Sequence, residues 1–416
     1  VPIGIVALFM VFRFLHIPVL HNRVRIDWWG AAALVMGVVP LLLVAEQGRT
    51  WGWGSGLSIA CFVTGAVGIL LFILIESRMG DDALIPLSLF RSSTFSMATV
   101  IGVLVGFGMF AGMMMIPFVL QIVHGMDPTQ AGLATLPMIL GLMIASIGSG
   151  QIIARTGRYR MFPIIGTALM AVGYGVLSLQ HYDSPLWMLL AGQLIMGLGL
   201  GQLMQTLTIA SQNSVTPKDM GVATAGATFF RQLGGTLGVA VVFSVLFSRV
   251  VDTMAASFQR TDLLAGMQAA MQDPAVLADP ANARILEVLQ DPSGLGTALN
   301  DDSSFLNGAD PRLTAPFLDG FSTATSTVFV VGMVVVLVAF VLSLFFRTPP
   351  LRQRSAMEEA LAEKAELDQL AASQTSTGSI ALPVVGGPER DDASTEGTDA
   401  RPGGASAMGV RAERDD

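Results

Sequence analysis

Long apolar stretches, separated by short polar connections, run through this 416-residue chain as far as residue 346. Several of them exceed the ~20 residues that an α-helix needs to cross a bilayer. Buried strands of soluble α/β proteins are also apolar, but these stretches are too long and too many for that alternative. The pattern therefore predicts an all-α polytopic membrane protein. Nine apolar segments are expected, at residues 1–15, 28–45, 56–75, 96–123, 131–153, 161–179, 186–211, 220–248 and 320–346.

The polar connections carry their basic residues almost entirely on one side of the predicted membrane. Twelve Lys and Arg residues fall on that side, whereas the short connections of the other side contain only Arg49. Because short cytoplasmic loops are enriched in basic residues, the first side is predicted to be cytoplasmic, together with the C-terminus. The twelve are Arg13, Arg23, Arg25, Arg78, Arg91, Arg155, Arg158, Arg160, Lys218, Arg347, Arg352 and Arg354.

The first apolar segment differs from the others in its length and its flanks. About a dozen apolar residues would span only ~18 Å as a helix, against a hydrocarbon core of ~30 Å. Its basic residues follow the apolar run, whereas a signal peptide carries them in front. With residue 13 cytoplasmic, Val1 would point outward, which implies an odd number of earlier spans. We therefore interpret residues 1–15 as the end of a transmembrane helix in a truncated chain.

Two further segments lie outside the predicted spans. Residues 249–319 form a long outer loop, in which helical periodicity over 261–272 and 280–290 predicts two or three short helices. This loop is interpreted as a decoration without catalytic role, with a lid or partner site as the alternative. Residues 347–416 are expected to hold one charged cytoplasmic helix, capped by Ser355, and then a disordered tail.

Composition and charge exclude several classes of function. Only 13% of the residues are charged, against about 25% in soluble proteins. The net charge of −8 comes mostly from acids in 252–319 and 358–416, outside the spans. Cys61 is the single cysteine, which excludes a disulfide framework and a cysteine-based metal site. Nothing in this composition indicates a nucleic-acid partner.

Catalytic chemistry is not visible in the predicted spans. None of them has Asp or Glu near its middle, and Asp27, Glu46 and Glu76 are expected to be solvated charges at span edges. The sequence contains no His pair with ligand spacing, no Ser/His/Asp set, no Gly-rich phosphate loop and no HExxH motif. We therefore expect a protein that is not an enzyme and that binds no cofactor and no metal.

Glutamines form the main polar feature of the seventh apolar segment, "AGQLIMGLGLGQLMQTLTIASQ". At 100° per residue, Gln202, Gln205 and Gln212 fall on one broad helical face. Gly197 and Gly201 lie beside it and indicate close helix packing. An unsatisfied amide that faces lipid costs several kcal/mol, so the glutamines are expected to line a wet cavity. Hydrogen bonds to neighbouring helices are the alternative.

Arg231 lies inside the eighth apolar segment, about 15 Å along the helix from Gly221. A charge at that depth indicates a functional role, and snorkelling to the cytoplasmic rim is the alternative. Gln232 is expected to share its role. Gln121 is the polar exception in "FGMFAGMMMIPFVLQ", whose Met and Phe side chains are interpreted mostly as packing or lipid-facing, with an adaptable binding wall as the alternative.

Three stretches resemble the fourteen-span drug:proton antiporter branch of the major facilitator superfamily. "MIPFVLQIVHGMDPTQAGLATLP" is similar to its span–loop–span signature, and "FFRQLGGTLGVA" to its penultimate span. "GSGQIIARTGRYRMF" resembles the second copy of the superfamily's cytoplasmic loop signature. Gly150, Arg155, Gly157 and Arg158 match that signature, and Ala154 replaces its acidic residue.

The resemblance implies a bacterial inner-membrane exporter that exchanges drugs for protons by alternating access of two six-helix bundles. Residues 28–75 would be two linker helices, and 96–346, with the loop 249–319, the C-terminal bundle. The N-terminal bundle, with the proton-coupling acids, would be missing from this sequence and needed for function. The alternatives are an exporter dedicated to a lipid, siderophore or metabolite, a polytopic membrane enzyme, and a membrane receptor or scaffold.

Overall fold

The computed structural model of the chain describes residues 2–14, 27–80, 83–290, 306 and 308–347. Every regular element within these ranges is a helix, and eight helical stretches are long and apolar enough to cross a membrane. The polytopic all-α class is therefore confirmed. The stretches are α2 (Trp28–Trp51), α3 (Gly56–Met79), α4 (Ser93–Ile122), α5 (Pro128–Ala134) with α6 (Leu136–Thr156), α7 (Met161–Ser178), α8 (Leu186–Asn213), α9 (Met220–Ser257) and α14 (Pro311–Leu344).

The two ends of the chain add little to this picture. The first apolar segment forms α1 (Pro2–Phe14), a helix of 13 residues with largely exposed side chains. Its interpretation as the end of a longer span stays a prediction. The charged helix predicted after Ser355 and the disordered tail lie outside the described residues.

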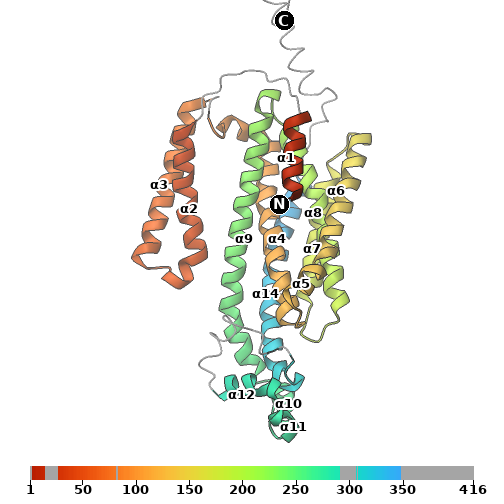
Figure 1. Cartoon of the computed structure of the whole chain (residues 1–416). Helices are drawn as coiled ribbons and strands as arrows, with labels where there is room; N and C mark the ends of the chain where they lie inside the picture. The colour runs from red at the N-terminus through yellow and green to blue at the C-terminus, as the bar shows by residue number, and fades with distance from the viewer. Residues whose placement is uncertain (1, 15–26, 81–82, 291–305, 307, 348–416) are drawn as a thin grey trace, which may run out of the picture. The chain divides into compact units, whose positions relative to one another are not determined.

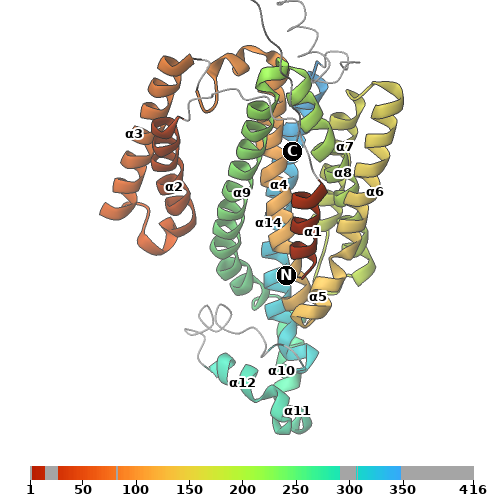
Figure 2. The same ribbon diagram turned by 45° about the horizontal axis from the view of Figure 1, so that its top comes forward.

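Six of the long helices pack into one bundle (Figure 1). α8 lies against α6 and α7, α4 packs against α9, and α14 contacts α4, α7 and α9. α2 and α3 pair with each other, and α2 also touches α9 (Figure 2). The helices α2 and α3 thus form a pair beside the six-helix bundle, and the division into linker helices and a C-terminal bundle stays a prediction.

Glycines set how closely the bundle helices approach one another. A Cβ on Gly197 or Gly201 of α8 would lie 2.1 or 2.2 Å from the carbonyl oxygens of Met138 and Leu142 on α6. Helix association in membranes depends on small residues that allow such close approach. The close-packing role predicted for this glycine pair is confirmed.

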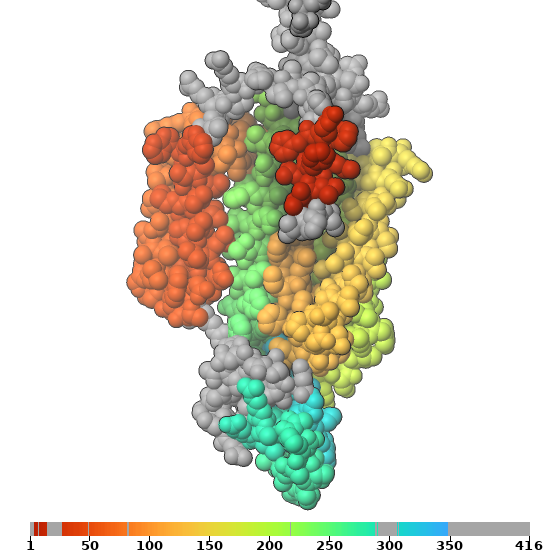
Figure 3. All heavy atoms as spheres, viewed as in Figure 1, coloured from red at the N-terminus to blue at the C-terminus, as the bar shows by residue number. Residues whose placement is uncertain are grey.

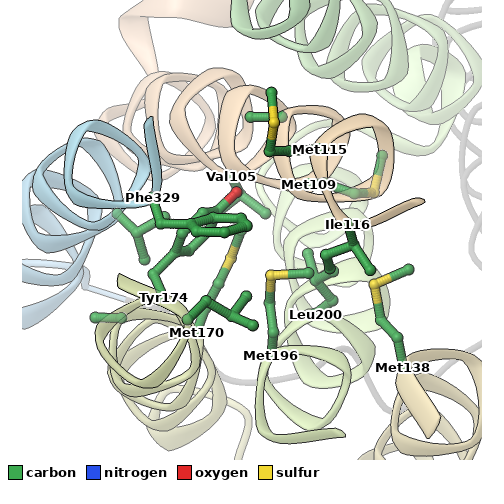
Figure 4. Close-up of a cluster of buried hydrophobic side chains, with 14 of the residues drawn as sticks. Val105, Met109, Met115, Ile116, Met138, Met170, Tyr174, Met196, Leu200 and Phe329 are labelled. Carbon is green, nitrogen blue, oxygen red and sulfur yellow. The ribbon is translucent and has the colours of Figure 1, made fainter. Parts of the chain in front are cut away.

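Several methionines cluster in the interior of the bundle (Figure 4). The flexible thioether side chain of methionine fills irregular gaps between helices. Tyr174 of α7 lies fully inside this core, and its hydroxyl donates a hydrogen bond to the carbonyl oxygen of Gly108 on α4. In the Met- and Phe-rich stretch of α4, Met113 and Met114 are exposed. The buried methionines shown are Met109, Met115, Met138, Met170 and Met196.

Short helices close one end of the bundle, between α9 and α14 (Figure 3). They are α10 (Thr261–Met271), α11 (Pro274–Ala278) and α12 (Ala283–Gln290), which confirms the prediction of two or three helices in this loop. We call this end the cap end, and the opposite end, with the α6–α7 loop at residues 157–160, the signature end. The cap has a small core of its own, made of Ala270, Val276, Ile285, Leu306, Leu313 and Phe317.

Two long helices extend beyond their predicted spans toward the cap. α9 continues to Ser257, past the predicted end at residue 248, and α14 begins at Pro311, before the predicted start at 320. Buried Asp319 lies within the extension of α14, where it accepts hydrogen bonds from Ser257 at 2.8 Å and Arg260 at 2.9 Å. The two helices can therefore continue together, because the charge that ends the apolar run is paired.

The prediction of solvated charges at span edges is wrong for two of three residues. Glu46 is exposed as expected, but Asp27 and Glu76 are only 5% and 1% exposed. Asp27 accepts the N–H of Gly30 in the first turn of α2, and Glu76 accepts the N–H of Ile85 in the segment after α3. Hydropathy along one helix cannot show this burial, because it depends on the neighbouring helix.

Candidate substrate-binding site

The three glutamines predicted to line a cavity from α8 have different surroundings. Gln202 is half-buried and donates to the Leu198 carbonyl of its own helix at 3.2 Å. Gln212 is half-buried and donates from Nε2 to Thr224 Oγ1 of α9 at 3.0 Å. Gln205 is exposed and makes no hydrogen bond within the part of the chain that the structure describes. Gln205 is therefore the glutamine of this row that is available to a ligand.

Arg231 lies inside α9, at a point where the backbone of α9 contacts α4 closely. A Cβ on Gly106 would lie 2.1 Å from the carbonyl oxygen of Arg231, so these helices meet at van der Waals contact. The Arg231 side chain is half-buried, and no carboxylate of the described chain forms a salt bridge with it. Gln232, next along the helix, is exposed. Neither side chain thus has a hydrogen-bond or ion-pair partner among the described residues.

The six predicted residues occupy different levels of the bundle. Gln121 is half-buried at the cap end of α4, whereas Gln212 lies near the signature end of α8. Gln202, Gln205, Arg231 and Gln232 fall between these two levels on α8 and α9. The set is therefore spread along the helices and does not form one compact site.

A cavity of about 520 Å³ lies between α2 and α9, toward the cap end. Its walls include the rings of Trp53, Phe243 and Phe247, and Glu46 is its charged lining residue. Sequence reasoning missed this cavity because it forms where the linker pair meets the bundle. None of the six predicted residues lines it. The lining residues are Ala45, Glu46, Gln47, Thr50, Trp53, Val239, Ala240, Phe243, Ser244 and Phe247.

The loop signature forms the turn between α6 and α7. Gly157 ends α6 with φ +67°, and its N–H donates to the Ile153 carbonyl at 2.8 Å. This left-handed conformation favours glycine, because it has no Cβ. Gly150 lies within α6, where a Cβ would meet open space. Arg155 and Arg158 are exposed around the turn. The turn therefore requires glycine at 157 and not at 150.

A buried tyrosine braces this loop, and the sequence analysis missed it. Tyr159 is only 1% exposed, and its hydroxyl accepts a hydrogen bond of 3.1 Å from Nδ2 of Asn213, at the end of α8. Burial raises the pKa of the Tyr159 phenol, and the Asn213 hydrogen bond opposes that effect. The sequence signal that could have identified this residue is its position, because an aromatic side chain stands two residues after the turn glycine. The bond ties the signature loop to α8.

Comparison with known proteins now identifies the family. The sequence profile of the Major Facilitator Superfamily matches residues 28–239, which begin with α2 and end within α9. The chain belongs to the major facilitator superfamily. This superfamily member is 39% identical over 336 residues to a tetracycline resistance determinant of Streptomyces rimosus, an alignment that covers 80% of this chain and 94% of the relative.

Two further relatives extend the comparison. The chain is 27% identical over 369 residues to the multidrug transporter protein MdtP of Bacillus subtilis, with 88% of this chain and 66% of the relative covered. It is 32% identical over 327 residues to an uncharacterized MFS-type transporter of Mycobacterium tuberculosis, and spans 43% of that protein's length. These similarities confirm the predicted membership in the drug-exporter type of this superfamily of multi-pass membrane transporters.

Proposed function

We propose that this protein is a secondary transporter that exports drugs or other amphipathic small molecules across the bacterial inner membrane in exchange for protons. The observation that carries the proposal is the 39% identity to a tetracycline resistance determinant over 336 residues. The similarity to a multidrug transporter over 88% of the chain supports a broad range of substrates. The six-helix bundle and the linker pair supply the architecture that the proposal needs.

Basic side chains support an orientation with the signature end in the cytoplasm. Arg155, Arg158 and Arg160 are exposed there, and Arg78 and Arg91 are exposed at the ends of the neighbouring elements. Short cytoplasmic loops of membrane proteins are enriched in such residues. The cap of α10–α12 would then face the outside, and the C-terminus the cytoplasm.

Substrate would meet this bundle on the walls formed by α4, α6, α8 and α9. Gln205 is the strongest candidate for direct contact, because its amide is exposed and has no partner in the described chain. Arg231 and Gln232 extend the same polar path on α9. Gln121 and Gln202 complete it, whereas Gln212 contributes through its bond to α9. An apolar wall with few polar groups suits amphipathic ligands of varied shape.

Proton coupling is proposed from the exporter branch that the motifs resemble. The helices of the bundle carry no Asp or Glu near the middle of a span; Asp319 lies close to the cap end of α14. The coupling acids are therefore proposed to lie in a second, N-terminal bundle, against which this one moves in alternating access. The described residues would then supply the substrate wall and not the coupling group.

Drug accumulation in cells tests this proposal. A drug-sensitive bacterium that expresses the complete gene should accumulate less tetracycline and less of a fluorescent cationic dye than the empty host. A protonophore should raise accumulation to the level of the host. Gln205→Ala should alter accumulation, whereas Gln272→Ala, an exposed glutamine of the cap, should not. Equal accumulation with and without the protein, at verified expression, would overturn the proposal.

A further inference from the structure

The linker helices α2 and α3 cross at a contact between two glycines. A Cβ on Gly68 would lie 2.3 Å from the backbone nitrogen of Gly37. Because the helices are antiparallel, a residue before Gly37 lies opposite a residue after Gly68. Asp27 is ten residues before Gly37, and Glu76 eight residues after Gly68. At a rise of 1.5 Å per residue, these acids lie ~15 and ~12 Å from the crossing, at nearly the same height.

Glu76 points from α3 into the seam between the helices. The buried residues of α3 are Ser58, Gly65, Gly68 and Glu76, and the two glycines mark the face in contact with α2. Glu76 shares that face, because eight residues of helix return to within about 80° of the starting direction. The seam is therefore lined by small residues and ends in a buried acid.

Asp27 lies at the same end of this seam, at the start of α2. It is 5% exposed, and Glu76 is 1% exposed. The segment after α3 folds over the pair, where Ala83 and Ile85 are each 6% exposed. The electrostatic field of Asp27 reaches Glu76, so the two carboxyls share one buried environment.

Each carboxyl group has one oxygen with a partner and one without. Asp27 Oδ1 accepts the Gly30 N–H at 2.7 Å, and Glu76 Oε1 accepts the Ile85 N–H at 3.0 Å. Asp27 Oδ2 and Glu76 Oε2 are buried and have no hydrogen-bond partner among the residues that the structure describes. Buried side-chain oxygens without a hydrogen-bond partner are rare in folded proteins, so each of these two calls for an explanation.

No positive charge of the described chain neutralises the pair. Neither carboxyl forms a salt bridge with a described residue. Arg78, near the end of α3, and Arg91, after the covering segment, are exposed. α9 meets α2 at the cavity beside exposed Glu46, at the opposite end of α2. Two ionised carboxylates in this seam would therefore repel each other, and no basic residue of the described ranges compensates that repulsion.

We propose that Asp27 and Glu76 form a proton-binding site that holds one proton at neutral pH, so that one group is a carboxylic acid and the other a carboxylate. Burial and the like charge both oppose ionisation of the second group. The acid form also supplies an O–H donor within a site that lacks one. Because the groups interact, the proton belongs to the pair and not to either residue.

The site adjoins the connection between the linker pair and the bundle. The Glu76–Ile85 bond holds the start of the segment that leads through η2 (Leu87–Arg91) into α4. Loss of the proton at alkaline pH places a second charge in the seam, which favours opening of the seam and release of that segment. The site thus makes this connection sensitive to pH. It is separate from the proton exchange proposed for transport and does not depend on it.

Infrared spectroscopy of the purified full chain in detergent tests the site directly. The wild type should show the carbonyl band of a single buried protonated carboxyl at neutral pH, and the band should disappear on alkaline titration. Glu76→Gln should remove the band, because it removes the more deeply buried carboxyl of the pair. Asp27→Asn should keep the band and lower the pH at which it disappears, because Glu76 then loses its proton without a like charge beside it. Glu46→Gln removes an exposed carboxyl of the same helix pair and should leave the band unchanged.

Two results would overturn the proposal. One is the absence of a protonated carboxyl band in the wild type at neutral pH, including a wild type that instead retains a sodium or potassium ion at the pair. The other is a band that persists in Glu76→Gln, or a band that disappears at the same alkaline pH in Asp27→Asn as in the wild type. If one variant fails to fold, the other decides, since each removes one member of the pair. Transport is not measured, so this result is independent of the exporter proposal.

Discussion

Gln212 of α8 donates a hydrogen bond of 3.0 Å to Thr224 of α9 and so links the two helices near the signature end of the bundle. Gln205, seven residues earlier on the same face, has no such partner and is exposed. Residues that look equivalent along one helix therefore differ in what surrounds them. The structure separates a glutamine that links two helices from one that is exposed and has no partner among the described residues.

These two glutamines should respond differently to the same substitution. Gln212→Ala should lower the free energy of unfolding by about 1 kcal/mol, because Thr224 loses its donor. Gln205→Ala should leave stability unchanged and alter the initial rate of drug efflux. Thermal unfolding in detergent and efflux from loaded cells measure the two effects. Equal stability changes in both variants, with normal efflux from cells that express Gln205→Ala, would show that both residues have a structural role only.

The contact between α4 and α9 at Arg231 should not tolerate an extra methyl group. A Cβ at position 106 would lie 2.1 Å from the Arg231 carbonyl oxygen, so Gly106→Ala must move the helices apart. Overpacking of this kind costs about 1–3 kcal/mol. Gly102→Ala, one turn earlier on α4, is the matched control, because a Cβ there meets open space. Thermal unfolding of both variants should show a loss for Gly106→Ala alone.

The turn of the signature loop should depend on one of its two glycines. Gly157 has φ +67°, where a Cβ costs about 1–2 kcal/mol. Gly157→Ala should therefore lower the unfolding temperature. Gly150→Ala should be neutral or slightly stabilising, because alanine is favoured over glycine inside a helix. Equal unfolding temperatures for the two variants would show that the loop does not need the left-handed conformation.

His124 should make stability depend on pH. Burial lowers the pKa of this imidazole, which lies between α4 and α5. Its Nε2 atom is buried and has no hydrogen-bond partner among the described residues. An unfolded histidine takes up a proton below about pH 6.5, whereas the folded one resists it. Stability should therefore be full above that pH and decline as the pH falls through it toward the folded pKa.

Replacement of this histidine tests the pH dependence. His124→Gln should flatten the dependence of the unfolding temperature on pH between pH 7 and pH 5, an interval that follows from the ordinary histidine pKa of about 6.5. His181→Gln replaces an exposed histidine beyond α7 and should leave the slope as it is in the wild type. An unchanged slope in His124→Gln would show that this imidazole does not set the acid sensitivity.

The spans could be predicted from the sequence, because each of them needs only its own apolar length to be recognised. Their ends near the cap could not. α9 and α14 continue past the apolar runs because Asp319 pairs with Arg260, a residue 59 positions away. The close helix contact at Gly197 and Gly201 could also be predicted from the sequence, since small residues at that spacing favour close helix approach.

Polar groups were harder to predict, because their environment belongs to the neighbouring helix. Asp27 and Glu76 lie at the edges of apolar runs and look solvated along the chain, yet both are buried, and the Glu76 carboxylate accepts the N–H of Ile85 in the segment after α3. The bond from Gln212 depends on where α9 crosses α8, and the cavity beside Glu46 depends on how α2 meets α9. Sequence patterns identify such residues, and only packing decides what they do.

Transport in everted membrane vesicles tests the central claim most directly. Vesicles from cells that express the complete gene would be energised so that their interior is acidic and then given tetracycline or a fluorescent cationic dye. The account predicts accumulation of the compound inside, above that of vesicles without the protein, and its rapid loss when an exchanger of protons for potassium collapses the pH gradient. Accumulation no greater than in control vesicles, or accumulation that survives collapse of the gradient, would contradict it.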